Sequence, residues 1–230
     1  DKPMIFYPLS VLLMMEIKEI LIISTNEHLP FYKILFGTGK KYNLKLSYLV
    51  QDEPKGLADA LIIGKEFVNG SPFALILGDN FIFGNDLVNI LKNAKNETIY
   101  RHNAMIFTNH VNNPEQFGIA EATENGTVIS MEEKPKNPKS NMAIIGLYLF
   151  PNIATKYVNE IKPSDRGELE IISVLDIFLK KNKLKCEEFG RGVTWLDTGT
   201  FDDLLEASNF VRIIKNSQGK NIGCIEEVLL

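Results

Sequence analysis

The sequence has 230 residues, 45% of them hydrophobic and 23% charged, and its 25 basic and 29 acidic side chains give a net charge of −4. This is the composition of an ordinary globular protein, so it excludes a disordered chain, and the length predicts one large α/β domain. The acidic balance and the absence of a Lys/Arg block exclude binding driven by a nucleic-acid backbone. We therefore expect any phosphate that the protein handles to belong to a small molecule.

Cysteine usage and apolar runs bear on the compartment. Cys186 and Cys224 lie far apart, with no His or Cys neighbour at a metal-ligand spacing. They predict neither a zinc site nor a disulfide framework, and they favour a reducing cytoplasm. The apolar stretch 4–15 is similar to the core of a signal peptide, but it contains Pro8 and lacks a small-residue cleavage site, which favours a buried helix. No apolar run reaches the ~18 residues of a membrane span, so we expect no membrane partner.

The first half of the sequence alternates helical and strand-like patterns. Helices are expected over residues 3–18, 28–36, 56–67 and 86–94, with Asp1 as the N-cap of the first. Strands are expected over residues 20–24, 44–50 and 73–77. The first and third of these strands are continuous apolar runs, which is typical of strands buried on both faces. This alternation predicts right-handed crossovers and a mostly parallel sheet.

After about residue 100 the pattern changes to strands separated by turns rich in Asn, Pro and Gly. The expected strands are 104–110, 117–121, 127–132 and 143–150. Helices over 169–181 and 201–215 enclose two further strands, 186–189 and 193–196. There is no linker or repeat, so the sequence predicts one α/β domain with a β-rich elaboration at one end of the sheet.

Two carboxylates follow apolar strands. Asp79 comes after the 73–77 run and Gly78, and Asp197 comes after Trp195 and Leu196, just before a helix. Ligands bind outside the carboxyl ends of the strands in open parallel sheets, although either Asp could simply cap a turn or a helix. The pair suggests a hard divalent cation such as Mg²⁺, with substrate phosphates and water as further ligands. The three histidines are scattered and support no zinc site.

Three loops could contact substrates. The loop 51–58 contains Pro54 and Gly56 and opens a helix, so its backbone amides could bind an anion while Gln51 reads the edge of a base. Such loops are also common connectors. Glu133 and Lys134 end a strand, and adjacent strand residues point to opposite faces, so one of them could face a pocket or both could lie on a solvated edge. The segment that precedes the helix at 169 is mostly acidic, and Arg166 is the one residue in it that could bind an anion.

The ordered set of motifs is more specific than any one of them, and it resembles the sugar-phosphate nucleotidyltransferase family over essentially the whole sequence. The motifs are Gln51 with Pro54-x-Gly56-Leu57-Ala58, Leu77-Gly78-Asp79-Asn80, Pro114-x-x-Phe117-Gly118, Glu133-Lys134-Pro135, Gly146-Leu147-Tyr148, Arg166-Gly167-Glu168-Leu169-Glu170-Ile171 and Trp195-Leu196-Asp197-Thr198-Gly199.

The resemblance implies a Rossmann-like, mostly parallel mixed sheet with a β-rich sugar-binding part. Residues 1–100 would form the nucleotide-binding core, and residues 101–230 the sugar-binding part and the return to the core. It further implies Asp79 and Asp197 as ligands of Mg²⁺, and Lys134 and Arg166 as catalytic cations on the sugar phosphate. The implied substrate-binding residues are Gln51, Pro54, Gly56 and Leu57 around the base, and Gly118, Glu133 and Ile144 in the glucose pocket, with Phe117 at its border. Leu77 and Trp195 are implied as further substrate-binding residues.

The implied reaction forms dTDP-glucose and pyrophosphate from dTTP and glucose 1-phosphate. A phosphate oxygen of the sugar phosphate attacks the α-phosphorus of dTTP in line, so the protein positions two polyanions and neutralises charge. The family also implies a cytoplasmic homo-oligomer, a dimer or a tetramer. Its glycine-rich G-x-G-T-R loop has no counterpart in the sequence, and its last helices would follow Glu227. We therefore expect the sequence to be truncated at both ends.

Phe117 stands where the family commonly has Tyr, and Ile145 where it has Thr or Val, so the identity of the sugar is the more open part of the prediction. Base choice rests on a few hydrogen bonds and a methyl group, which leaves a UTP-using or other sugar-1-phosphate pyrophosphorylase as an alternative. A metal-dependent glycosyltransferase is disfavoured, because Gly78-Asp79-Asn80 does not supply its D-x-D motif. A non-catalytic module that binds a sugar nucleotide is the alternative from another class.

Overall fold

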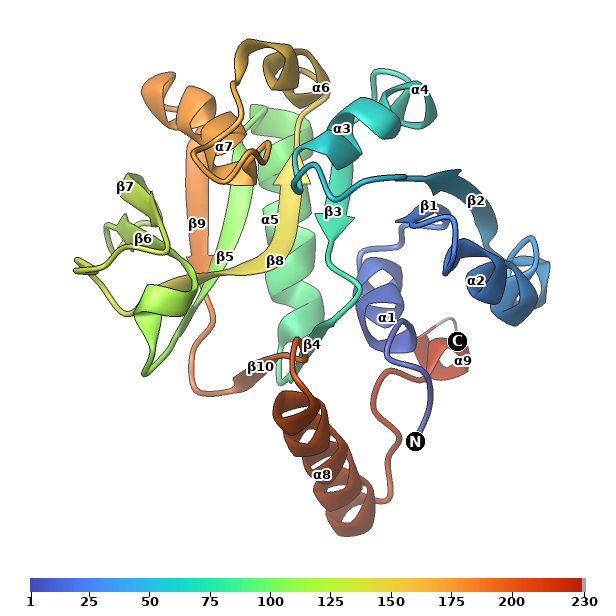
Figure 1. The fold of residues 1–230 in the computed structure, drawn as a ribbon. Helices are drawn as coiled ribbons and strands as arrows, with labels where there is room; N and C mark the ends of the chain where they lie inside the picture. The colour runs from blue at the N-terminus through green and yellow to red at the C-terminus, as the bar shows by residue number, and fades with distance from the viewer. Residues whose placement is uncertain (229–230) are drawn as a thin grey trace.

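A six-stranded mixed sheet forms the centre of the molecule, and helices cover both of its faces (Figure 1). The structure is a computed structural model and describes residues 1–228. The sheet has the order β7-β6-β8-β5-β9, and β3 pairs with β8 beside this path. Its strands are β3 (Phe73–Ile76), β5 (Ala104–His110), β6 (Gly118–Ala122), β7 (Val128–Glu133), β8 (Met142–Phe150) and β9 (Leu184–Glu188). The long strand β8 runs antiparallel to β3, β5 and β6, whereas β5 and β9 are parallel.

Strand β8 separates two hydrophobic cores because its side chains alternate between the two faces of the sheet. Ala143, Ile145, Leu147 and Leu149 belong to the core on the side of α5 (Leu87–Arg101) and α1 (Phe6–Met14). Ile144, Tyr148 and Phe150 belong to the other core, which includes the buried face of α7 (Ile171–Lys180). The helices α5 and α7 thus lie on opposite faces of the sheet (Figure 1).

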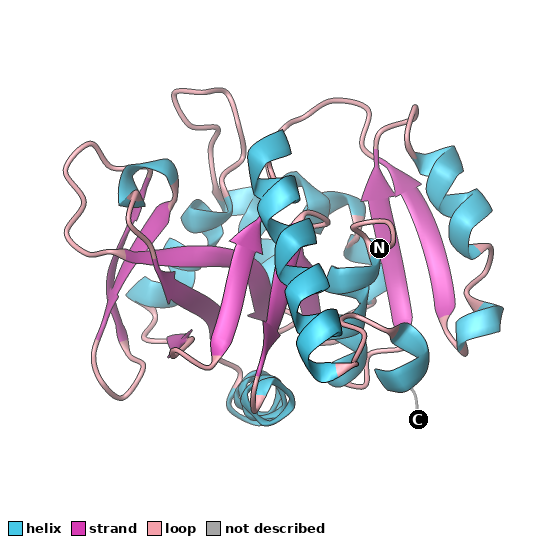
Figure 2. Cartoon of the chain, turned by 90° about the horizontal axis from the view of Figure 1, so that it is seen from below, coloured by secondary structure: helices cyan, strands magenta, loops and turns pink. Residues whose placement is uncertain are grey.

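A separate parallel pair, β1 (Glu19–Ser24) and β2 (Lys45–Val50), lies beside the central sheet together with α2 (Leu29–Phe36), as Figure 2 shows. An apolar groove of about 380 Å³ lies between β1 and β3, with α3 (Asp59–Ile63) and α4 (Lys65–Val68) along it. Within residues 1–228, β1 pairs only with β2 and β3 only with β8. Each of these strands therefore has one unpaired edge on the groove.

An antiparallel ribbon of β4 (Asn80–Gly84) and β10 (Val193–Asp197) completes the strands. Its register places Asp197 opposite Asn80, at the end of the ribbon that is nearest to β3 in the sequence. The helix α8 (Phe201–Gln218) follows directly and packs on the ribbon through Phe81, Phe210 and Val211. The ribbon therefore carries the second predicted metal carboxylate next to the first.

Most predicted elements are confirmed to within a few residues, and four expectations are wrong. Asp1 does not cap α1, because its carboxylate instead accepts a hydrogen bond from the Tyr7 hydroxyl at 2.9 Å. The helix expected over 56–67 is divided into α3 and α4 at Gly64. Strand β4 was not predicted, and α5 extends seven residues beyond the predicted end at residue 94.

Five short elements were also missed: α6 (Ala154–Tyr157), α9 (Ile225–Val228) and the 3-10 turns Lys40–Tyr42, Pro114–Gln116 and Val158–Glu160. The predicted mixed α/β class is confirmed, but the expectation of a mostly parallel sheet is wrong. Four of the five strand pairings in the six-stranded sheet are antiparallel, and β3 pairs antiparallel to β8 and not with β1. Across residues 1–228, the structure contains no helix that combines the length and the apolar character needed to cross a bilayer.

Candidate active site

A cavity of about 320 Å³ opens where β7, β8 and β10 meet the loop that precedes α7. It collects ten of the predicted site residues, namely Leu57, Leu77, Phe117, Gly118, Glu133, Lys134, Ile144, Arg166, Trp195 and Asp197. In the sequence these residues extend from Leu57 to Asp197, and the fold brings their motifs together around one cavity. They therefore place two carboxylates, two cations and an apolar wall within one space.

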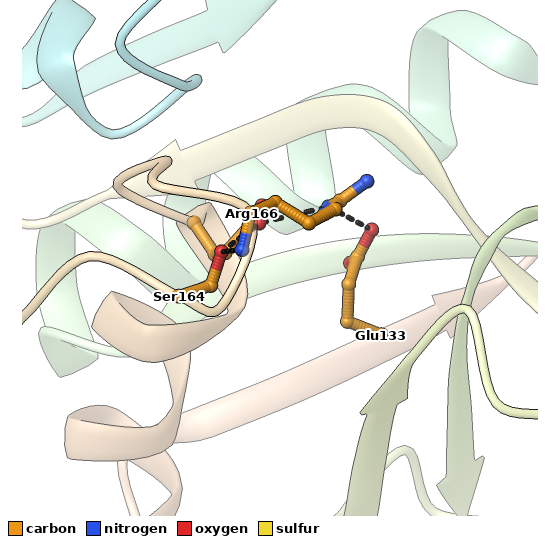
Figure 3. A network of polar contacts seen from close by, with 4 residues as sticks. Glu133, Ser164 and Arg166 are labelled. Atoms are coloured by element: carbon orange, nitrogen blue, oxygen red, sulfur yellow. Dashed lines mark hydrogen bonds and ion pairs between the residues drawn. The ribbon is translucent and has the colours of Figure 1, made fainter.

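Arg166 is held in the cavity by two carboxylates (Figure 3). Its Nη2 atom donates to Glu170 Oε1 at 2.8 Å and to Glu133 Oε1 at 3.3 Å. The Ser164 hydroxyl donates to the same Glu170 oxygen at 2.8 Å and so fixes the loop around it. The Arg166 side chain is still 44% exposed, and Nη2 is the guanidinium nitrogen that makes both of these bonds, so other donors can face an incoming anion.

Glu133 and Lys134 both line the cavity, although the alternation of a strand would send them to opposite faces. The rule does not apply because β7 ends at Glu133 and Lys134 has a left-handed backbone with φ of 42°. Burial, followed by the negative charge of Glu170, raises the pKa of Glu133, and Arg166 and Lys134 act in the opposite direction. A residue other than glycine with such a backbone costs about 1–3 kcal/mol, and such strain is concentrated at functional sites.

Asp79 and Asp197 are joined through Thr198, whose backbone N–H and hydroxyl both donate to the Asp79 carbonyl oxygen, at 3.0 and 2.7 Å. Burial and the charges of Asp79 and Asp203 raise the pKa of Asp197 to about 6. Asp197 lines the cavity and Asp79 does not, but two carboxylates that repel each other are a donor set that a divalent cation would stabilise. Among the described side chains there is no cluster of three or more acidic, His or Cys ligands, so such a cation would depend on substrate oxygens.

Asn80 connects these carboxylates to the rest of the site and was not predicted. Its side chain is 1% exposed. The Nδ2 atom donates to Asp79 Oδ1 at 3.0 Å, and Oδ1 accepts from the Gly146 backbone N–H at 3.0 Å and from Trp195 Nε1 at 2.7 Å. The signal in the sequence was a polar residue that opens the apolar run Phe81-Ile82-Phe83, because a buried amide there requires partners.

The predicted base-binding loop lies beside the cavity, and only Leu57 of its predicted residues lines it. Gln51 Nε2 donates to Asp59 Oδ2 at 2.9 Å, and Pro54 is exposed. Gly56 has φ of 98°, and a Cβ atom there would lie 2.5 Å from the carbonyl oxygen of Leu169. Backbone hydrogen bonds on either side, from Leu169 to Lys55 at 2.7 Å and from Ala58 to Leu169 at 3.0 Å, fasten this loop to the Arg166 loop.

The apolar wall fixes the shape of the cavity. Trp195 packs edge-on against Phe117, with ring centroids 5.4 Å apart. A Cβ at Gly118 would lie 2.9 Å from Ile172 Cδ1 and 3.2 Å from the Glu133 carboxylate, so a side chain there would close the space. Ile172 and Glu170 also line the cavity and, like Asn80, were not predicted as site residues.

Comparisons with known proteins identify the family of the chain. The model of the nucleotidyl transferase family matches residues 1–213, and the chain belongs to this family. Its relatives include the glucose-1-phosphate thymidylyltransferases of Neisseria meningitidis serogroup A, 44% identical, and of Mycobacterium tuberculosis, 41% identical. Each match extends over 228 residues and covers 99% of this chain and 78% of the relative.

Solved structures have the same fold. A Bacillus anthracis protein assigned as a glucose-1-phosphate thymidylyltransferase, crystallised with a sucrose, is 34% identical and superposes with a TM-score of 0.81. The match covers 91% of this chain and 82% of that one. A UDP-glucose pyrophosphorylase bound to UDP-glucose is 23% identical with a TM-score of 0.80, covering 92% and 87%, and indicates the fold alone. The predicted family and fold class are therefore confirmed.

Proposed function

We propose that this chain transfers the thymidylyl group of dTTP to glucose 1-phosphate and forms dTDP-glucose and pyrophosphate. The observation that carries the proposal is one cavity that contains Glu133, Asp197 and two cations, Lys134 and Arg166. In this proposal the Glu133 carboxylate accepts hydrogen bonds from the sugar. The identity of 41–44% to glucose-1-phosphate thymidylyltransferases over 99% of the chain supports the choice of substrates.

The residues of the cavity divide the work between the sugar and its phosphate. Glu133 accepts hydrogen bonds from sugar hydroxyls, and Gly118 and Ile144 leave the room that the ring needs. Lys134 and Arg166 bind the sugar phosphate and offset the repulsion between the two polyanions. A phosphate oxygen then attacks the α-phosphorus of dTTP in line, the bond from that phosphorus to the β-phosphate breaks, and pyrophosphate leaves. The protein contributes position and electrostatics, and no covalent intermediate is needed.

Asp79 and Asp197 would hold Mg²⁺. Burial, followed by the negative charges of Asp79 and Asp203, raises the pKa of Asp197, and a cation between the two carboxylates would relieve this repulsion. When bound, the ion would stabilise negative charge on the phosphates. The protein's own part is to keep the two carboxylates together, which the double hydrogen bond from Thr198 to Asp79 achieves.

The thymine base belongs against the loop of Gln51, Pro54, Gly56 and Leu57. In this division residues 1–100 bind the nucleotide and residues 101–230 the sugar. Gln51 has one amide group with which to read a base, and its bond to Asp59 fixes the orientation of that amide. Discrimination between thymine and uracil through so few contacts is expected to amount to about 1–3 kcal/mol.

We further expect a homo-oligomer. Phe201 is 92% exposed and Leu205 61% exposed on α8, and an apolar surface of this kind is typical of a protein interface. Sedimentation velocity tests this directly, and a monomer at all concentrations would contradict it.

Calorimetric titration of the chain with dTDP-glucose in Mg²⁺, with UDP-glucose as competitor, tests the site. The product contacts base, sugar and metal residues together, so we expect binding that prefers thymine. Glu133→Gln should weaken it, and Glu66→Gln, at an exposed position on α4, should not. A folded chain that binds neither nucleotide sugar would contradict the proposal, and equal binding of both would contradict the thymine assignment.

A further inference from the structure

Asn80 lies where three parts of the site meet. It is the first residue of β4, and its three side-chain hydrogen bonds reach Asp79, Gly146 on β8 and Trp195 on β10. Gly146 also accepts a hydrogen bond from the Leu77 backbone N–H at 2.8 Å, so the strand that leads to Asp79 is tied to the same point. One buried amide therefore connects the ribbon that carries Asp197 to the sheet that carries the cavity.

The geometry of this amide fixes which way the Asp79 carboxylate points. The carbonyl oxygen of Asn80 accepts from two N–H groups, so the amide cannot flip without placing its NH₂ against two donors. With the oxygen held, Nδ2 is aimed at Asp79 Oδ1 at 3.0 Å. The exposed Asp79 thus receives its orientation from a side chain that is itself 1% exposed.

We infer that Asn80 is a positioning residue for the cation site: it orients Asp79 and locks the β4–β10 ribbon so that Asp79 and Asp197 face one ion. The inference rests on the proposed function, because it needs those two carboxylates to bind a divalent cation. Groups that hydrogen-bond to a metal ligand typically contribute 10–100-fold to metal affinity. A loss of metal affinity of that size on removal of the Asn80 amide is what a positioning role predicts.

Asn103 provides a matched control. It is also a buried asparagine, 7% exposed, and its Nδ2 atom also donates to a carboxylate oxygen, Glu97 Oε2, at 3.0 Å. It lies at the end of α5 and outside the cavity. Asn80→Ala and Asn103→Ala therefore each remove an amide-to-carboxylate hydrogen bond from a buried site, and only the first should alter the cation site.

The experiment measures Mn²⁺ binding by electron paramagnetic resonance in the presence of saturating dTDP-glucose, whose phosphate oxygens complete the ligand set, with Mn²⁺ as the probe in place of Mg²⁺. Asn80→Ala should weaken Mn²⁺ binding by about tenfold or more, whereas Asn103→Ala should leave it within about twofold. Equal affinity of Asn80→Ala and the unmodified chain would overturn the positioning role and leave the proposed function intact. Failure of the unmodified chain to bind Mn²⁺ would overturn both the metal assignment and this inference.

A measurement on the unmodified chain covers the case in which Asn80→Ala does not fold. The side-chain amide resonances of Asn80 should shift as Mg²⁺ is added to the chain saturated with dTDP-glucose, while those of Asn103 stay in place. The indole N–H of Trp195, the single tryptophan in the sequence, should shift with Asn80 because the two share a hydrogen bond of 2.7 Å. Mg²⁺ binding without a shift of the Asn80 amide would refute the inference.

Discussion

Gly56 offers the sharpest test of how the predicted base-binding loop, residues 51–58, is held against the loop that carries Arg166 before α7. Its φ of 98° strains any other residue, and an alanine Cβ would lie 2.5 Å from the oxygen and 2.6 Å from the nitrogen of Leu169. Both atoms belong to the backbone, so they cannot move without disturbing the hydrogen bonds from Leu169 to Lys55 and from Ala58 to Leu169. Gly56→Ala should therefore carry two costs, one for strain and one for lost bonds.

Gly70 separates the two costs. Its φ is 74°, and a Cβ there would meet nothing within 4 Å, so Gly70→Ala should cost only the strain, about 1–2 kcal/mol. Gly56→Ala should cost the same strain and two backbone hydrogen bonds of about 0.5–1.5 kcal/mol each, or about 2–5 kcal/mol in total. The excess of about 1–3 kcal/mol is the contribution of the contact between the two loops.

Urea unfolding measures this excess. With an m-value of about 3 kcal/mol per M, Gly56→Ala should unfold at a midpoint about 0.3–1 M below that of Gly70→Ala. The displaced loop should also weaken dTDP-glucose binding by about tenfold or more, whereas Gly70→Ala should not affect it. Equal midpoints and equal affinities of the two variants would refute the argument that the contact at Leu169 holds the loop.

Four further changes test the site and the core. Asp197→Ala should lower turnover by about 10²–10³-fold with an unchanged circular dichroism spectrum, and unaltered turnover would contradict the metal assignment. The pKa of Glu133 is raised, and its ionised form is the one proposed to accept hydrogen bonds from the sugar hydroxyls. The affinity for dTDP-glucose should therefore fall as the pH drops through that raised pKa. Calorimetry across pH should find a weaker pH dependence for Glu133→Gln. Trp195 emission should change on addition of dTDP-glucose, and a constant spectrum at saturation would place the sugar elsewhere. Phe178→Ala, at a side chain 1% exposed between Phe150 and Tyr157, should cost about 3–5 kcal/mol in urea unfolding.

The order of helices and strands could be predicted from local patterns, but the pairing of strands could not. Strand β3 is a continuous apolar run, which is typical of a buried strand in a parallel sheet. Its partner is instead the antiparallel strand β8, which begins 66 residues after β3 ends. Nothing in the local sequence of either strand specifies that pairing. The ribbon of β4 and β10 joins segments more than 100 residues apart. Topology of this kind depends on long-range packing and not on the local propensity of each segment.

The motifs identified ten residues of the cavity, whereas the contacts that orient them depend on the folded structure. Lys134 was expected to point away from Glu133, and its left-handed backbone, which the Glu-Lys-Pro sequence does not reveal, brings it to the same side. Asn80 was not predicted as a site residue because its hydrogen-bond partners, Gly146 and Trp195, are 66 and 115 residues away in the sequence. Residues that line the cavity can thus be found from sequence, and residues that hold them in place require the structure.

The groove between β1 and β3 has a consequence for the behaviour of the chain in solution. An unpaired strand edge presents backbone N–H and C=O groups to any extended segment, and natural proteins protect such edges with charges, bulges or a covering element. Here the two edges border an apolar groove whose floor includes Leu12, Ile20 and Leu61. Within residues 1–228, the edges of β1 and β3 are therefore places where an extended segment, from this chain or another, can add a strand.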